Sequence, residues 1–272
     1  MSPLFSVILS TYNSEKWLKK VLLGFAKQSF KDFELIIADD GSRGSTNELI
    51  KKLRPILFYS INHVWHPDNG FQKTIILNKA LQASIGSYIV FTDGDCIPRA
   101  DFLYFHFINK SKGYFLSGGY FKLDMYLSNL ISVTDIRDQS CFSIRWLRNR
   151  GLPFSYKNLK ISSGEYMSRF LNFITPTKPS WNGHNSSAWR SDIFSINGFD
   201  ERMKYGGEDR EMGERLINYG IKAKQIRYSA ICLHLDHTRG YIDKSSWILN
   251  NKIRKSTKID KKIWTDFGIV KN

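Results

Sequence analysis

The sequence has few cysteines and no long apolar run. Cys96, Cys141 and Cys232 are the three cysteines among 272 residues, and they lie far apart, which argues against a disulfide scaffold and against a structural zinc site. No stretch approaches the roughly 18–20 apolar residues that cross a bilayer. The first residues, MSPLFSVILSTYN, show neither the basic segment nor the cleavage site of a secretory signal. We therefore expect a protein of a reducing, cytoplasmic compartment.

Acidic residues are also scarce. There are 25 Asp and Glu against 40 Lys and Arg, which gives a formal net charge of +15. Two segments hold most of the surplus: residues 145–169 contain six basic residues and one acidic residue, and residues 244–272 contain eight and two. Such a surplus indicates a polyanionic partner (nucleic acid, anionic lipid or a phosphorylated small molecule), or it serves only solubility. With 42% hydrophobic residues, the composition excludes a mostly disordered chain.

What the sequence does contain is an alternation of strand-like and helix-like segments. Short apolar runs predict strands at residues 5–10, 33–38, 56–61 and 88–91, and helical spacing predicts helices at 15–25, 45–53 and 72–83. Strands and helices that alternate in this way predict an α/β fold with a mostly parallel sheet. In such sheets, ligands bind beyond the carboxyl ends of the strands.

The later part of the chain is less regular up to about residue 180. We expect a helix near residues 124–149, followed by loops or small strands. From residue 181 the pattern sharpens, because a helix is predicted to begin at Glu208 and to end at Gly220. A further strand is predicted from about Ala223 to Leu233. The chain contains no internal repeat.

Asp93 and Asp95 form the sharpest local feature, because they directly follow a predicted buried strand. Gly94 between them lets the backbone turn and lets a bulky ligand approach. Two such carboxylates are hard oxygen ligands that suit Mg²⁺ or Mn²⁺, and the ion would neutralise a diphosphate. The alternative is a solvated turn, since Asp-Gly is common in turns.

Two further acidic pairs lie at the ends of predicted elements. Asp39 and Asp40 follow the second strand, so their turn opens on the same sheet edge as the Asp93 turn. A carboxylate there could accept hydrogen bonds from a ribose or a base, or the turn could simply end the strand. Glu208 and Asp209 begin a helix, where the helix dipole alone would stabilise them. The same position would also suit a general base that deprotonates a hydroxyl.

Two histidines follow the last predicted strand. His234 or His237 is a candidate third metal ligand, although a lone histidine is more often structural. His184, in the segment Trp181 to Asn185, stays open between the two interpretations.

Together, these motifs resemble the inverting glycosyltransferases of family 2 with the GT-A fold. The resemblance rests on STYN at 10–13, ADDGS at 38–42, FTDGDCIP at 91–98, WRSDIFSINGFDE at 189–201 and YGGEDREMGERL at 205–216, and it covers roughly residues 4–110 and 180–238. The C-terminal part is similar to the galactosyltransferase-type module of bacterial chondroitin-type polymerases and animal β-1,4-galactosyltransferases. The resemblance implies a Rossmann-like, mostly parallel sheet flanked by helices. It also implies a nucleotide-sugar-binding half (1–110), an acceptor-binding and catalytic half (111–240) and a basic tail (241–272).

The resemblance further implies roles for individual residues. The nucleotide-sugar would be bound by Thr11, Tyr12, Asp40, Lys73, Asn78, Asp93 and Gly94. A Mn²⁺ or Mg²⁺ ion would be held by Asp95, Asp93 and His234. Catalysis would fall to Asp209 as general base with Glu208 beside it, and the acceptor would meet Tyr205, Gly207, Glu208 and Trp181. Tyr205 stands where relatives often carry Trp, and residues 111–180 have no counterpart.

The implied activity is transfer of a sugar from a UDP-sugar to a hydroxyl of a glycan or lipid-linked glycan, in the synthesis of a bacterial surface polysaccharide or lipopolysaccharide. The basic segment 244–262 would lie on an anionic membrane at the inner face of the plasma membrane, or it would be a solvated tail. Two alternatives stay open. A pI near 9.6 suits a nucleic-acid-binding protein, and paired aspartates also serve metal-dependent phosphodiesterases.

Overall fold

The computed structural model describes residues 2–238 and 244–271, and its strands form one eight-stranded sheet with the order β3-β2-β1-β4-β7-β6-β8-β5. The strands are β1 (Phe5–Thr11), β2 (Phe33–Asp39), β3 (Ile61–Trp65), β4 (Tyr88–Asp93), β5 (Cys96–Pro98), β6 (Tyr114–Lys122), β7 (Ser186–Trp189) and β8 (Lys222–His234). Neighbours are parallel from β3 to β4 and between β6 and β8, whereas β7 and β5 are antiparallel to their neighbours. The expected α/β fold with a mostly parallel sheet is confirmed.

Helices connect and cover these strands. They are α1 (Glu15–Phe25), α2 (Gly44–Leu53), α3 (Lys73–Ala83), α4 (Phe102–Asn109), α5 (Met125–Leu130), α6 (Val133–Arg137), α7 (Ile144–Arg148), α8 (Leu159–Ser162), α9 (Glu165–Ile174), α10 (Arg190–Ser195), α11 (Glu208–Asn218) and α12 (Lys244–Ile259). Short 3₁₀ turns occupy η1 (Arg54–Ile56), η2 (Ser140–Phe142) and η3 (Tyr156–Asn158). In the part of the chain that the structure describes, no helix combines the length and the apolar character needed to cross a membrane.

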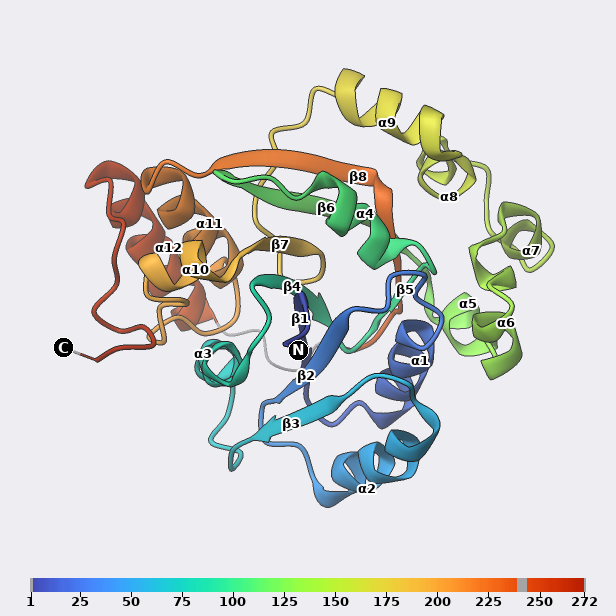
Figure 1. Cartoon of the computed structure of the whole chain (residues 1–272), viewed down its shortest axis with the longest axis horizontal. Helices are drawn as coiled ribbons and strands as arrows, with labels where there is room; N and C mark the ends of the chain where they lie inside the picture. Colours follow the sequence, from blue (N-terminus) through green and yellow to red (C-terminus); the bar gives the residue numbers. More distant parts are fainter. Residues whose placement is uncertain (1, 239–243, 272) are drawn as a thin grey trace.

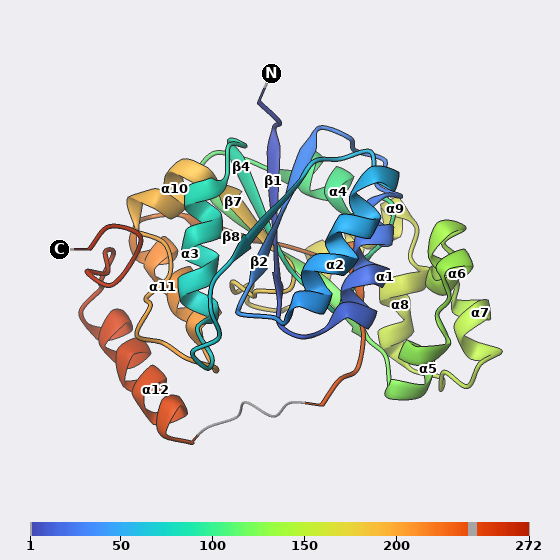
Figure 2. The same ribbon diagram turned by 90° about the horizontal axis from the view of Figure 1, so that it is seen from below.

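Apolar side chains fill both faces of the sheet, as expected for parallel strands that are buried on both sides. In β1, Val7 and Leu9 belong to one core cluster and Ile8 to the other. Helices α1, α2 and α4 cover the first face, and α3, α10 and α11 cover the second (Figures 1 and 2). Because β1, β2 and β4 run in the same direction, the turns that follow them meet at one edge of the sheet.

The sheet also joins the two halves that the sequence divides near residue 110. The antiparallel pair of β4 and β7 ties the early strands to the later ones. The short β5 strand pairs with the end of β8, which sets Cys96 beside His234 and Pro98 beside Cys232. Cys96, Cys141 and Cys232 are buried free thiols, so none of them forms a disulfide.

The strand predicted at residues 56–61 is wrong. Pro55 lies in the 3₁₀ turn η1, Ile56 is 69% exposed, and the true strand β3 begins at Ile61. β3 is an edge strand that pairs only with β2 among the described strands, and its sequence INHVW alternates apolar and polar residues. The preceding apolar run, Ile56 to Phe58, gives the stronger strand pattern, although it lies outside the sheet.

The helix predicted near residues 124–149 is also wrong, because this segment is broken into short pieces. The side chains of Asp124, Ser132 and Ser143 each accept a hydrogen bond from the backbone N–H three residues later, so each begins a new helix. Residues 150–180, which the sequence assigns to loops or small strands, contain helices α8 and α9.

The basic C-terminal segment is folded against α11. The Thr257 hydroxyl on α12 donates to Glu211 (2.9 Å), and the carboxylate of Glu211 also pairs with the buried Arg215 (2.8 Å). The Asn218 amide donates to the backbone oxygens of Thr257 and Lys262. The described residues of this segment therefore form a packed helix and not a solvated tail.

Asn185 fastens three strands from inside the sheet. Its Nδ2 donates to the backbone oxygens of Gly119 on β6 (2.7 Å) and Ala230 on β8 (2.9 Å), and its Oδ1 lies 2.9 Å from His106 Nε2. A methyl group added at Gly118 would overlap the Asn185 amide, so this close approach requires glycine.

We expect Gly118→Ala to lower the free energy of unfolding by about 1–3 kcal/mol, because the overlap forces Asn185 out of its hydrogen bonds. Gly44→Ala is the matched control, since a methyl group there meets open space. Urea denaturation of the two variants measures the difference. Equal stabilities would contradict the assigned packing of Asn185.

Candidate active site

Lys73 lies at the centre of the site. It is the first residue of α3, and its Nζ lies 3.1 Å from Oδ1 of Asp93 at the end of β4. The same oxygen accepts a 2.6 Å hydrogen bond from the Ser10 hydroxyl on β1. Because both partners of the ion pair are largely buried, solvent screens it less than a surface pair. The pair links the N-terminus of α3 to the turn that contains Asp93.

Glu208 and Asp209 approach the same ammonium group from the N-terminus of α11. Burial would lower the pKa of Lys73, but the negative charges of Asp93, Asp209 and Glu208 outweigh that effect and raise it. Gly207 precedes α11 with φ of 92°, a left-handed conformation that favours glycine. The structure thus brings the Asp93 turn and the Glu208–Asp209 pair together around one lysine.

The pKa values of the three carboxyl groups move in opposite directions. Burial raises the pKa of Glu208 to about 7, and the charge of Asp209 adds to this effect. Burial also raises the pKa of Asp209, while Lys73 opposes the rise and Asp93 adds to it. Burial would raise the pKa of Asp93 as well, but Lys73 and the Ser10 hydrogen bond lower it to about 2. At neutral pH, Asp93 is therefore ionised, and the other two hold protons more tightly than usual.

Asp95, Cys96 and His234 form a group that could hold a metal ion. Their ligand atoms all lie within 4.8 Å of one another, because β5 pairs with the end of β8. His234 Nε2 lies 3.7 Å from Asp95 Oδ2, and His237 Nε2 lies 2.9 Å from the same oxygen. His234 Nδ1 is buried without a hydrogen-bond partner among the described residues. Asp93, the other predicted ligand, lies outside this group.

His184 lies between the metal-ligand group and Lys73. Its ring centroid is 4.5 Å from that of Tyr120 on β6 and 6.4 Å from that of His234. Burial lowers the pKa of His184 to about 4, although the charges of Asp93 and Asp95 oppose this effect. The sequence leaves His184 ambiguous and gives no reason to select Tyr120. Their position depends on β6 and the loop before β7, which no local pattern predicts.

Asp40, predicted to contact the nucleotide, is tied to the start of α3. Its Oδ1 lies 2.8 Å from His66 Nε2, and its Oδ2 accepts a 3.0 Å hydrogen bond from the backbone N–H of Gln72. The carboxylate therefore helps to fix the turn that presents Lys73. His66 is a partner that sequence analysis misses.

Thr11, Tyr12 and Gly94 lie at the ends of β1 and β4. The Thr11 hydroxyl oxygen is buried without a hydrogen-bond partner in the described part of the chain, and the half-exposed Tyr12 donates to Asp68 (2.8 Å). The Gly94 N–H donates to the backbone oxygen of Ser10 (2.7 Å), and a methyl group at Gly94 would lie 2.9 Å from that backbone oxygen. Glycine is therefore needed to hold the Asp93–Asp95 turn against β1.

Asn78, predicted to bind the nucleotide-sugar, forms a set of hydrogen bonds within the protein. Its side chain is buried, its Nδ2 donates to the backbone oxygen of Phe199 and to Glu201, and its Oδ1 accepts from the Phe199 N–H. Both hydrogens of the amide are used in these bonds. Asn78 therefore holds α3 against the segment before α11.

Trp181, predicted to contact the acceptor, is enclosed in the core. Its indole is 1% exposed and packs edge-on against Phe91 and Phe115 in the core. The ring therefore packs the core beside the second face of the sheet. By contrast, the predicted acceptor contact Tyr205 is only half-buried, and its ring lies 5.8 Å from that of Phe71.

Helix α12 supports the loop that precedes Glu208. The Asn250 Nδ2 donates to the backbone oxygens of Lys204 (2.9 Å) and Gly206 (3.0 Å), and the Trp247 side chain packs against Gly206. The C-terminal segment is thus part of the scaffold of the site.

The raised pKa of Glu208 leads to a prediction about stability and pH. In the folded protein the pKa of Glu208 is about 7, whereas an ordinary glutamate, as in the unfolded chain, has a pKa of 4.5. Stability from this group is therefore complete below pH 4.5 and is lost as the pH rises through 7. We expect Glu208→Gln to stabilise the protein relative to the wild type by about 2 kcal/mol at pH 8, and to give much less at pH 4.5.

Urea denaturation at both pH values in the presence of a chelator measures this effect. The exposed Glu165 provides the control variant Glu165→Gln. If Glu208→Gln changed stability equally at pH 4.5 and pH 8, the pKa of this carboxyl would not be raised in the folded protein.

Comparison with known proteins gives two matches along the chain. A family model described as glycosyl transferase family 2 matches residues 6–106, and one described as the N-terminal domain of galactosyltransferase matches residues 171–238. Chondroitin synthase from Escherichia coli is 26% identical over 240 residues, which cover 81% of this chain and 33% of that protein. The chain therefore spans about a third of the length of this curated relative.

Solved structures share the fold. The crystal structure of Staphylococcus aureus TarS 1-349 in complex with UDP has a TM-score of 0.62 at 18% identity, covering 96% of this chain and 68% of that one. The mannosyltransferase PcManGT from Pyrobaculum calidifontis, in complex with GDP-Man and Mn²⁺, has a TM-score of 0.55 at 16% identity, covering 96% and 63%. These matches favour a glycosyltransferase over the nucleic-acid-binding and phosphodiesterase alternatives. The chain therefore shares the GT-A fold with these structures, and its residues 6–106 are similar to glycosyl transferase family 2.

Proposed function

We propose that this protein is a metal-dependent, inverting glycosyltransferase that moves a sugar from a UDP-sugar to a hydroxyl group of a glycan acceptor. The observation that carries the proposal is a buried oxygen of Asp209. Asp209 Oδ1 has no hydrogen-bond partner among the described residues, although it belongs to a carboxylate beside Lys73 and Asp93. Buried polar atoms are rarely left without a partner, so an unpaired one at such a site points to a ligand.

In this proposal Asp209 is the general base. A carboxylate with a raised pKa is a better base near neutral pH than an ordinary one. It would accept the proton of the acceptor hydroxyl while that oxygen forms a bond to the anomeric carbon and the bond from that carbon to the diphosphate breaks. Attack from the face opposite the diphosphate inverts the anomeric configuration. Glu208, which is also buried, would contact the acceptor sugar beside Tyr205 and Gly207.

Asp95 and His234 would hold the divalent ion, and Asp93 would assist through its neighbouring turn. The fit rests on the chemistry of the donor set and on the unpaired Nδ1 of the His234 ring. Bound Mn²⁺ or Mg²⁺ would supply positive charge to the leaving diphosphate. Lys73 supplies a second, fixed positive charge at the same edge, and its pairing with Asp93 keeps it oriented.

The donor side is assigned to the ends of β1 and β2. Among the described residues the Thr11 hydroxyl oxygen has no partner, the Tyr12 ring is half-exposed, and the Asp40 N–H donates to the backbone oxygen of Thr11. UDP as the nucleotide is supported by the TarS complex with UDP, whose fold the chain shares. A glycan acceptor in surface polysaccharide synthesis is supported by relatives such as chondroitin synthase.

We also propose that the protein acts at the inner face of the plasma membrane. Buried free thiols at three positions suit a reducing compartment. For the segment 244–262, contact with an anionic membrane is supported by exposed Ile248 and Ile259 on α12, which alternate with exposed Lys252 and Lys255.

The first test measures UDP binding and transfer separately. We expect UDP to bind tightly only with Mn²⁺ present in the wild type, and Asp95→Ala to lose the Mn²⁺ effect. We expect Asp209→Asn to retain Mn²⁺-dependent UDP binding while transfer from UDP-sugars falls by about 10²–10⁴-fold, because the base is lost. Calorimetry and a screen of UDP-sugars give the two readouts.

Asp192→Asn serves as the matched control, because Asp192 lies on α10 and belongs to neither acidic turn. Full transfer activity in Asp209→Asn would remove this residue from the role of base. UDP binding that is equally tight with and without Mn²⁺ would contradict the metal dependence.

The second test concerns the support that α12 gives to the loop before Glu208. We expect Asn250→Ala to lower kcat by about tenfold while the Kd for UDP with Mn²⁺ changes little, because a small displacement of a positioned group slows the reaction. Asn251→Ala, an exposed neighbour on the same helix, is the control. Equal kcat values for the two variants would show that these hydrogen bonds do not position the base.

A further inference from the structure

Helix α9 has its polar side turned inward and its apolar side turned outward. The Ser168 hydroxyl lies 3.2 Å from the Ser229 hydroxyl, and the Asn172 amide donates to Ser229 (2.8 Å) and accepts from the Tyr228 N–H (2.9 Å). These contacts hold α9 on β8 through hydrogen bonds. Surface helices of globular proteins normally pack with the opposite orientation.

The outward side of α9 is an uninterrupted apolar stripe. Tyr166 and Phe173 are each 89% exposed, and the helix spacing places Met167, Phe170 and Ile174 on the same side. All five side chains lie in the described part of the chain. A stripe of this size on a surface indicates an interaction site, because water is a poor environment for it.

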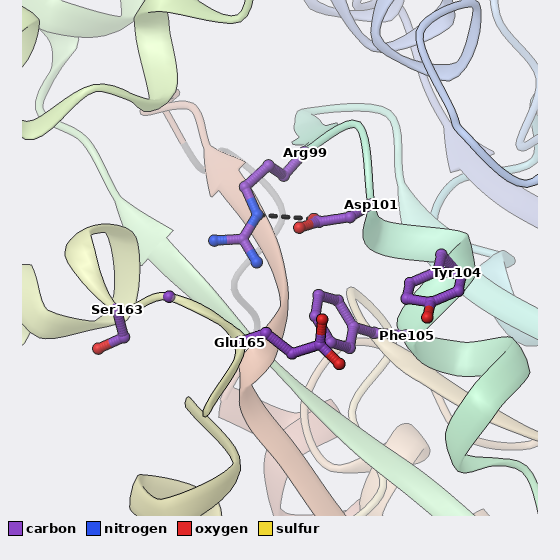
Figure 3. Close-up of a pocket in the computed structure, with 7 residues that line it drawn as sticks. Arg99, Asp101, Tyr104, Phe105, Ser163 and Glu165 are labelled. Carbon is purple, nitrogen blue, oxygen red and sulfur yellow. Dashed lines mark hydrogen bonds and ion pairs between the residues drawn. The ribbon is translucent and has the colours of Figure 1, made fainter. Parts of the chain in front are cut away.

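The helix also stands away from the body at its first turn. A hollow of about 340 Å³ separates Ser163, Gly164 and Glu165 from α4 (Figure 3). The opposite wall is formed by Arg99, Asp101, Tyr104 and Phe105, with Arg99 and Asp101 paired to each other (2.6 Å). Helix α9 is therefore supported by the contacts of its polar side with β8, and its apolar stripe faces away from the protein.

The surroundings of the stripe are strongly basic. Residues 145–178 contain seven Lys and Arg, and Glu165 is their one acidic residue. Glu165 is itself paired with Arg169 (2.7 Å). Phe154 and Tyr156, which precede α8, are also highly exposed. Helices α7, α8 and α9 follow one another along one side of the molecule in both views (Figures 1 and 2).

From this arrangement we propose that α9 and the segment before it form a surface that inserts its aromatic side chains into the interface of a bilayer containing anionic lipid. An apolar stripe flanked by Lys and Arg is the pattern of helices that lie in the plane of a membrane. The basic residues attract an anionic surface, and the aromatic rings then enter the headgroup region. A second copy of the chain fits less well, because two basic surfaces would face each other.

This surface is separate from α12. Both views place α12 at the opposite side of the molecule from α7 to α9, so the two surfaces would not lie on one flat bilayer together, and variants of each surface distinguish them (Figures 1 and 2). On α12, exposed lysines interrupt the apolar residues, whereas on α9 the stripe is continuous. The proposal does not depend on the sugar donor or on the active site.

The test is flotation of the full chain with vesicles, without any substrate. We expect the wild type to float with vesicles of phosphatidylglycerol and phosphatidylcholine in equal parts, and to bind weakly to phosphatidylcholine alone. We expect Tyr166→Ser/Phe173→Ser to lower the partition coefficient by about tenfold or more, because two largely exposed rings no longer leave water on binding. High salt should weaken binding of the wild type.

Ile56→Ser/Ile85→Ser is the matched control, since both side chains are highly exposed and lie outside the basic segments. Ile248→Ser/Ile259→Ser reports on α12, and thermal denaturation verifies that each variant is folded. The proposal is overturned if the wild type fails to bind, or if the α9 variant floats like the wild type. It is also overturned if sedimentation shows that the α9 substitutions dissociate a dimer while vesicle binding is unchanged.

Discussion

The site depends on the charge of Lys73. Three carboxyl groups from two distant parts of the chain act on its charge: Asp93 at the end of β4 is in direct contact, and Glu208 and Asp209 at the start of α11 add their negative charges. Without a cation among them, three buried negative charges would repel one another at a site with little water. The directions of the pKa shifts show that Lys73 affects the three carboxyl groups unequally. Asp93, in direct contact, is held ionised, whereas Glu208 and Asp209 keep raised pKa values.

This difference matters because Asp93 and Asp209 have different tasks in the proposed reaction. A carboxylate near a leaving diphosphate is useful only with a positive charge beside it, and Asp93 has one permanently. A base needs an affinity for protons, and Asp209 retains it because Lys73 compensates its burial only in part. The helix dipole of α11 adds a favourable term for both acidic residues of its first turn. The glycines before α11 and the α12 contacts keep that turn where the lysine can reach it.

Sequence patterns predict the parts of this arrangement that are local. The strands β1, β2 and β4 are apolar on both faces, and β2 and β4 end in acidic turns, so their position and the shared edge follow from the residues alone. The sequence also separates Asp209 from the Asp95 and His234 pair. The sequence does not show that the Asn78 amide forms hydrogen bonds with residues 199 and 201, or that the Trp181 ring is buried in the core. Both facts depend on segments far apart in the chain that pack together.

The remaining failures have a common physical cause. The apolar run at residues 56–58 looks like a buried strand and is exposed, and the segment of α9, predicted as loops or small strands, is a helix with its apolar residues outward. Periodicity shows which residues share a side of an element, but it does not show which side the rest of the protein covers. In α9 the polar side is covered, because Ser168 and Asn172 find partners on β8. A helix whose apolar side stays outside must have that side stabilised by something other than its own core. For this reason the orientation of α9, and not its composition, carries the argument for a membrane.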